Sequence, residues 1–313
     1  MRGYRLNPPP EAHGAYREGM DNRADIRDFL ASRRAKITPE QVGLPTSARR
    51  RVPGLRREEV AVLAGVSTEW YTRLEKGHIG GVSEEVLDAV AKALRLDDDE
   101  RTYLFDLARA ARPARRAPSR RKDVRVPDRI QWLLDSMTLS SAFVRNGRQD
   151  IVASNALARA LHAPVYESPA TAEHGRANIA RYLFLGRESE RFFPDWDAAA
   201  SATVALLRAE AGREPHDRAL RELVGELSTA SPVFRDHWAA HDVRIRHEGV
   251  KRLQHPDVGL LELTYQSLEL PLGQRAMHDL TTYTAEPGST SEERLKVLAS
   301  WKAAPAEISH PAT

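Results

Sequence analysis

Apolar and polar positions between Leu55 and Gly77 repeat with the period of two short helices. In the first half the apolar residues fall on one helix face, namely Val60, Leu63 and Ala64. Gly65 supplies the backbone freedom of a sharp turn, and Ser67 is placed to cap the second helix. That helix ends at Lys76, a cation in the last turn that precedes a C-terminal glycine. The pattern predicts a helix-turn-helix unit, and a plain helical hairpin is the alternative.

Three more helical patterns flank this stretch. They cover Ala24–Lys36, Ser83–Leu94 and the segment from Asp97 to Ala111. Residues 37–54 contain three prolines and two glycines, and therefore predict a loop. Residues 23–111 are thus expected to form an all-α domain of five helices. Residues 1–22 hold few apolar groups and are expected to be disordered.

The pattern changes after a basic, proline-containing linker over residues 112–125. A helical run over Ile130–Met137 comes first, and two short strand-like runs and several helical segments follow. Three further strand-like runs precede a last helix and a tail over residues 304–313. Residues 163–178 show no periodicity and predict a loop. Residues 126–303 are therefore expected to form an α+β domain, with an antiparallel sheet of about five strands whose helices cover one face.

Charge divides the chain in the same way. Residues 20–125 hold 23 Lys and Arg against 17 Asp and Glu, a net charge of +6, whereas residues 126–295 hold 19 against 24, a net charge of −5. A basic first part favours contact with a polyanion, although ordinary surface charge is an alternative reading. The chain has no cysteine, no long apolar run and no signal-peptide pattern, which together favour a cytoplasmic protein.

No catalytic constellation stands out in the sequence. The patterns typical of serine hydrolases, zinc proteases, P-loops and strand-linked dinucleotide sites are all missing. His237 and His241 have the spacing of two zinc ligands on a helix, but no third ligand is evident. We therefore expect neither an enzyme nor a metal or cofactor site.

The second helix of the helix-turn-helix carries the predicted contacts to DNA. Exposed residues early in such a helix face the base edges, and here these are Ser67, Thr68, Glu69 and Arg73. Contacts to the DNA backbone are expected from Arg57, Trp70 and Lys76, and from the loop arginines Arg49, Arg50 and Arg51. A solvated basic loop is the alternative for the three loop arginines.

Aromatic side chains gather in the second part of the chain. A core accounts for such a set by default, and a ligand pocket lined by some of its members is the alternative. The pocket candidates are Phe143, Tyr182, Phe184, Trp196, Trp238 and Tyr265.

Several motifs together resemble a known family. The steps Glu59-Val60-Ala61, Gly65-Val66-Ser67 and Leu74-Glu75-Lys76-Gly77 resemble the phage-repressor-like (XRE-type) helix-turn-helix. Arg57 departs from that pattern, because the family often carries Gln there. The stretches RVPGLRREEVAVLAGVS, WYTRLEKG, FVRN, PDWD, HDRALRELVGELS, WAAHDV and LELTY are similar to the MmyB-like transcription regulators of actinobacteria, over about residues 24–303.

This resemblance implies a lambda-repressor-like DNA-binding domain followed by a PAS-like ligand-binding or dimerisation domain. It further implies a transcription regulator that binds double-stranded DNA and senses a small hydrophobic ligand, with fatty acids as the candidate class. We expect this regulator to be a homodimer. No carboxylate anchor is evident, and Arg145 and Arg181 are guesses only. The alternative is a C-terminal domain that only dimerises or docks a protein partner and has no small-molecule ligand.

Overall fold

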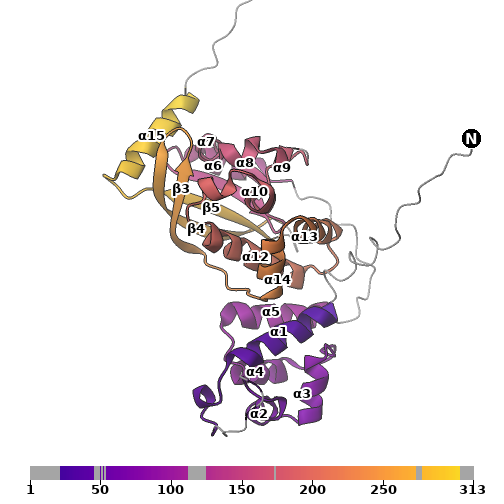
Figure 1. Cartoon of the computed structure of the whole chain (residues 1–313). Coiled ribbons are helices and arrows are strands. Elements are labelled where there is room, and N and C mark those ends of the chain that lie inside the picture. Colours follow the sequence, from indigo (N-terminus) through magenta and orange to yellow (C-terminus); the bar gives the residue numbers. More distant parts are fainter. Residues whose placement is uncertain are drawn as a thin grey trace, which may run out of the picture. The chain divides into compact units, whose positions relative to one another are not determined.

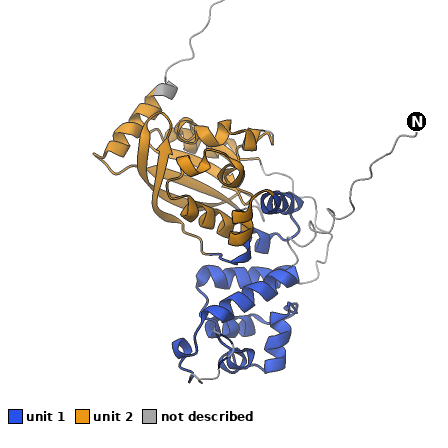
Figure 2. Cartoon of the chain, viewed as in Figure 1, with its two compact units in different colours: residues 1–120, 208–229, 238–243 blue, residues 121–207, 230–237, 244–313 orange. Residues whose placement is uncertain are grey.

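A computed structural model describes residues 22–45, 50, 52, 54–111, 125–172, 174–272 and 277–303. The chain divides into two compact units, coloured in Figure 2. Unit 1 comprises residues up to 120 together with Arg208–Thr229 and Trp238–Val243, and unit 2 comprises the rest. The disordered N-terminus, basic linker and C-terminal tail that the sequence predicts lie outside the described residues, except for Asn22 and Arg125.

Five α-helices build the N-terminal part of unit 1 (Figure 1). They are α1 (Asn22–Lys36), α2 (Arg57–Leu63), α3 (Thr68–Glu75), α4 (Glu84–Ala93) and α5 (Asp98–Ala110). The predicted all-α domain is confirmed, but Leu63, expected on the inner face of α2 with Val60, is exposed. The predicted loop over residues 37–54 holds one element that the sequence analysis missed, the 3-10 helix η2 (Glu40–Val42), which its short i→i+3 hydrogen bonds stabilise.

The helix boundaries follow from their caps. The Ser67 hydroxyl accepts a hydrogen bond from the backbone N–H of Trp70 at 3.1 Å, and Asp97 accepts one from Glu100 at 2.9 Å. Gly65 has the left-handed φ of 65° that the turn between α2 and α3 requires. The cap predicted at Ser67 is thus confirmed and Asp97 caps α5, whereas Ser83 makes no side-chain cap bond to α4.

Unit 1 also includes segments from much later in the chain. These are the last residues of α12 (Trp196–Arg213), nearly all of α13 (Arg218–Ala230) and residues 238–243. Val243 is buried in the same hydrophobic cluster as the helices α1 to α5. The Arg208 guanidinium is 1% exposed, lies 4.1 Å from the Trp238 ring centroid and pairs with Asp25 at 3.4 Å. Unit 1 therefore includes residues that lie far from the helix-turn-helix region in the sequence.

A five-stranded antiparallel sheet forms the centre of unit 2, as predicted. The strands are β1 (Ser141–Asn146), β2 (Ile151–Ser154), β3 (Glu248–His255), β4 (Gly259–Pro271) and β5 (Met277–Thr284), in the order β2-β1-β5-β4-β3. Because β5 pairs with both β1 and β4, the last strand of the chain is the central strand of the sheet.

Helices of unit 2 lie on both faces of this sheet, so the expectation that they cover one face is incomplete. Most share the core of Phe143 and Leu261, whereas Ile130 and Leu134 of the first helix pack with Ala142, Val144 and Leu280 on the other face. The helices include α6 (Asp128–Ser136), α7 (Ala156–Leu161), α8 (Ala163–Glu167), α9 (Pro169–Ala172), α10 (Ile179–Leu185), α11 (Ser189–Phe192), α14 (Pro232–Ala239) and α15 (Thr290–Ala303).

The prediction of a loop over residues 163–178 is wrong, because α8 and α9 occupy its first half. Helices of four or five residues are too short to produce a readable period. A local bond from the Thr171 hydroxyl to the Val165 carbonyl (2.7 Å) stabilises them instead.

Alternate residues of the strands point into the core of unit 2. The inner face carries Phe143, Leu253, Leu261, Leu263 and Tyr283, all buried. His162 at the end of α7 inserts among aromatic rings of this core, 5.2 Å from the Phe143 ring and 5.4 Å from the Tyr283 ring. Burial lowers the pKa of His162 to about 4, so the imidazole is neutral near pH 7.

Acid is expected to destabilise the fold through His162. Its folded pKa lies below the ordinary value of 6.5, so between these values the unfolded chain binds a proton that the folded chain does not. Lowering the pH from 7 to 5 should reduce the free energy of unfolding by about 2 kcal/mol at this site. Urea unfolding at both pH values should show this loss in the parent and a smaller loss in His162→Gln. The exposed His247→Asn control should keep the parent's loss, and an unchanged loss in His162→Gln would contradict the assignment.

Candidate nucleic-acid interface and ligand cavity

One face of α3 is exposed and charged. Glu69, Arg73 and Lys76 follow each other at helical spacing along this face, and all three are exposed. Within the part of the chain that the structure describes, none of them forms an ion pair. Ser67 and Thr68 at the start of the helix are exposed as well. The structure thus places all four predicted base-contacting residues on accessible surface of the second helix.

The opposite side of α3 is held by a buried carboxylate. Glu75 is 2% exposed and accepts a bidentate pair of hydrogen bonds from Arg34 of α1, at 2.8 and 3.1 Å. Arg57 at the start of α2 adds two bonds of 3.2 Å. We call these three residues the Glu75 ion cluster. Because it joins α1, α2 and α3, it fixes the orientation of the exposed face relative to the rest of the domain.

The same cluster extends to the chain that leads into α2. Arg34 also donates to the Leu55 carbonyl at 2.8 Å, and the Leu55 N–H donates back to the Arg34 carbonyl at 3.0 Å. Gly54 is required here, since a Cβ would lie 2.3 Å from the Arg34 carbonyl oxygen. The entry to the helix-turn-helix is therefore docked directly on α1.

The residues expected at the DNA backbone have different surroundings. Arg57 remains half exposed although it belongs to the Glu75 ion cluster. Arg50 is 12% exposed and forms a bidentate pair with Glu59, at 2.5 and 2.7 Å, so its guanidinium has a structural partner. Trp70, which the sequence analysis expects at the DNA backbone, is half-buried and packs on the core. Only part of its side chain is therefore exposed. Arg49 and Arg51 lie outside the described residues.

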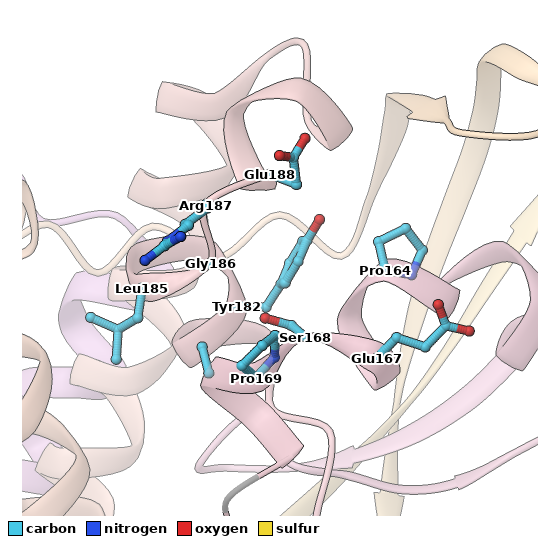
Figure 3. A pocket seen from close by; sticks show the side chains of 10 residues that line it. Pro164, Glu167, Ser168, Pro169, Tyr182, Leu185, Gly186, Arg187 and Glu188 are labelled. Carbon is cyan, nitrogen blue, oxygen red and sulfur yellow. The ribbon is translucent and has the colours of Figure 1, made fainter.

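A cavity of about 550 Å³ opens beside α10 in unit 2 (Figure 3). Its wall comes from α8, α9, α10 and the turn that follows α10: Pro164, Glu167, Ser168, Pro169, Ala170, Tyr182, Leu185, Gly186, Arg187 and Glu188. The Tyr182 ring extends into the middle of this group, with its hydroxyl on the side of Glu188 (Figure 3). That hydroxyl is buried and has no hydrogen-bond partner among the described residues, and burial raises its pKa to about 12. The cavity wall thus holds a buried, protonated donor that has no partner among the described residues.

Of the six aromatic residues proposed from the sequence, Tyr182 lines this cavity. Phe143 and Tyr265 each lie beside Tyr283 in the inner face of the sheet, with ring centroids 6.1 and 6.2 Å away. Phe184 contacts the Trp196 ring edge-on at 5.8 Å, and the Trp196 indole N–H donates to the Leu183 carbonyl at 3.2 Å. Trp238 belongs to unit 1, where it covers Arg208.

Among the described residues, no group of three or more His, Cys, Asp or Glu side chains has the arrangement of a metal site. His237 contacts Ser201 and Asp197, at 3.3 Å each, and His241 is buried in unit 1. No helix within the described ranges is long and apolar enough to cross a membrane.

Comparison with protein families agrees with this division of surfaces. A helix-turn-helix domain model matches residues 28–104, which contain α2, α3 and the Glu75 ion cluster. The model described as the MmyB-like transcription regulator ligand binding domain matches residues 126–298, more than half of the chain. The chain belongs to the MmyB-like transcription regulators. No curated protein matches the chain.

In this MmyB-like regulator, the family domains and the compact units do not have the same boundaries. Residues 208–229 and 238–243 fall within the ligand-binding domain match and also within unit 1. Helix α12 therefore has its first twelve residues, 196–207, in unit 2 and its last residues in unit 1. Sequence patterns gave no sign of this division, because the apolar period of a helix is the same whichever unit it packs against.

The Glu75 ion cluster is expected to stabilise the regulator's DNA-binding helices. Glu75→Ala leaves Arg34 without its buried partner, which should lower the free energy of unfolding by about 3 kcal/mol. Glu69→Ala is the matched control on the same helix, and its exposed side chain should change stability by less than about 0.5 kcal/mol. Thermal and urea unfolding of both variants measure the difference. Equal stability of the two variants would show that the cluster is dispensable.

Proposed function

We propose that this regulator acts as a cytoplasmic homodimer that binds a specific double-stranded DNA site and responds to a small hydrophobic ligand. The observation that carries the first part is the exposed face of α3, on which Glu69, Arg73 and Lys76 have no ion-pair partner among the described residues. Charged side chains held on a fixed helix and left unpaired are available to a partner with complementary groups. Bases and phosphates of duplex DNA supply such groups.

Each side chain on this face matches a known type of DNA contact. Arg73 has the fork geometry for two bonds to guanine, and Glu69 can accept from the amino group of cytosine. Ser67 and Thr68 suit either base edges or phosphates at the start of the helix. Lys76 and the exposed half of Arg57 suit phosphates, and Arg57 is held in place for that contact by Glu75.

A dimer follows from the size of the reading element. Helix α3 has eight residues and reaches only a few base pairs, too few to mark a unique site in a genome. Two copies related by a twofold axis would read half-sites about 34 Å apart, one turn of the double helix.

The ligand part of the proposal is supported by the cavity beside α10. Its volume of about 550 Å³ falls in the range of small-molecule sites, and its wall combines prolines, an alanine and a leucine with a few polar groups. The Tyr182 hydroxyl, buried in the cavity wall without a described partner, is a donor that an oxygen atom of a ligand would satisfy once the ring turns toward the cavity. A fatty acid combines an apolar body with such an oxygen.

Helix α12 is the element we propose to carry the ligand's effect. Its first part lies in the unit that contains the cavity, and Arg208 and Gly212 near its end lie in the unit that contains α3. A Cβ on Gly212 would lie 2.5 Å from the Tyr103 ring, so this end of α12 packs closely on α5. A shift of the helix would therefore act on the DNA-binding helices.

The base contact of Arg73 is testable once selection from a random duplex pool has defined the binding site. Arg73→Ala should weaken binding to that site by about 1–3 kcal/mol and relax preference at one position. Lys76→Ala should weaken binding to cognate and random duplexes alike. It should also reduce the slope of the logarithm of the binding constant against the logarithm of the salt concentration by about 1. Lys92→Ala, on the exposed side of α4, is the control. Parent-like affinity and selectivity of Arg73→Ala would refute the base contact.

A bound ligand is testable directly. Mass spectrometry of organic extracts from the purified regulator should recover an apolar compound in an amount comparable to the protein. Tyr182→Trp, which fills the cavity, should recover much less, whereas Phe105→Leu at a site in the DNA-binding domain should match the parent. Empty extracts, and no binding of added fatty acid, would favour the alternative that the C-terminal domain only dimerises or docks a protein.

A further inference from the structure

Helix α6 in unit 2 carries apolar residues on two sides. Ile130 and Leu134 are buried and pack with residues of β1 and β5 on one face of the sheet. Successive residues of a helix turn by about 100°, so Trp132 lies on the side opposite to these two residues. Trp132 is 71% exposed, and Leu133 next to it is 43% exposed. A helix that only covers a sheet needs one apolar side, so the second side indicates a further contact.

The exposure of Trp132 is unusual within this chain. The other tryptophans whose surroundings the structure describes are half-buried, namely Trp70, Trp196 and Trp238. Leu139, in the connection from α6 to β1, is also exposed. A single exposed leucine is normal on a protein surface, whereas an exposed tryptophan with apolar neighbours is typical of surfaces that bind another protein.

The charges on either side of Trp132 match those of a second copy of the same helix. Arg129 lies three residues before Trp132 and Asp135 lies three residues after it, and both are exposed. Arg129 forms no ion pair among the residues that the structure describes, and Asp135 accepts a hydrogen bond from the neutral Gln131 amide at 2.8 Å. The helix thus has an available cation on one side of its exposed tryptophan and an available anion on the other.

An antiparallel pair of α6 helices brings these charges together. With a twofold axis at Trp132, Arg129 of each copy comes level with Asp135 of the other copy. Packed helix axes are about 8–10 Å apart, a distance that an arginine and an aspartate side chain together can span. A parallel pair would place each residue level with its own copy and would bring like charges together. The order of the charges therefore favours the antiparallel arrangement.

The position of α6 in the chain also favours a second copy as the partner. The helix begins at Asp128, directly after the basic linker that leads from the DNA-binding helices. A contact here would join two copies next to the segments that connect each of them to its DNA-binding part. Recognition of two half-sites requires two such parts in one particle.

We propose that α6 forms the homodimer contact of this regulator, with two antiparallel copies that pack on each other around Trp132. Burial of Trp132 and Leu133 supplies the affinity, and ion pairs between Arg129 and Asp135 set the orientation. The inference rests on the proposed function, which includes a homodimer, and adds the surface that forms it.

Sedimentation velocity of the full-length regulator over a series of concentrations tests this contact. Trp132→Glu should raise the dissociation constant of the dimer by about 100-fold, because it removes the central apolar side chain and adds like charges at the axis. Val297→Glu, an exposed valine on α15, is the matched control and should leave the dimer intact.

A charge exchange tests the antiparallel arrangement. Arg129→Asp and Asp135→Arg should each weaken the dimer by about tenfold, and the double variant should recover to within about threefold of the parent. All variants should keep the parent's far-UV circular dichroism spectrum, which excludes unfolding as the cause.

The outcomes separate the contact from the dimer itself. A dimeric parent whose dissociation constant does not change in Trp132→Glu would overturn the α6 contact and leave the homodimer standing. Loss of affinity in both single charge variants without recovery in the double variant would overturn the antiparallel pairing. A parent that is monomeric both in solution and on its DNA site would overturn the homodimer and, with it, the contact.

Discussion

The buried carboxylate of Glu75 is the constraint on which the DNA-binding part of this regulator depends. It is 2% exposed, and its charge is compatible with burial only because Arg34 and Arg57 donate to both of its oxygens. These bonds tie the end of α3 to α1 and to the start of α2. The buried carboxylate on the inner side of α3 is thereby paired, whereas the charged side chains of its outer face form no ion pair among the described residues. The Glu75 ion cluster thus lies on the side of α3 that packs within the domain, opposite the exposed side that carries Glu69 and Arg73.

The core of unit 2 differs, because it contains ionisable side chains that form no ion pair among the described residues. The core face of its sheet holds a neutral histidine, His162, and a cation, Lys251, which has no described carboxylate beside it. A core built for stability alone would replace such groups with apolar ones. Together with the unsatisfied hydroxyl of Tyr182, they indicate a domain whose interior is arranged for a ligand as well as for packing.

Much of the fold was predictable because it depends on local patterns. The cap at Ser67 and the helix that starts near Asp97 depend on residues close in sequence, and the structure confirms both. The Glu75 ion cluster was not predictable, since its members are up to 41 residues apart and any surface glutamate looks the same in sequence. The cavity wall was missed for a related reason. Its helices α8 and α9 are too short to show a period.

The measurement that tests the account most directly is the affinity for the selected DNA site with and without a bound carboxylate. Delipidated regulator, titrated with labelled duplex at fixed salt, should change its dissociation constant at least about fivefold when dodecanoate is saturating. A control titration must show that dodecanoate is bound under the same conditions. Identical DNA affinities of the loaded and unloaded protein would contradict the claim that the second domain governs when α3 reads DNA.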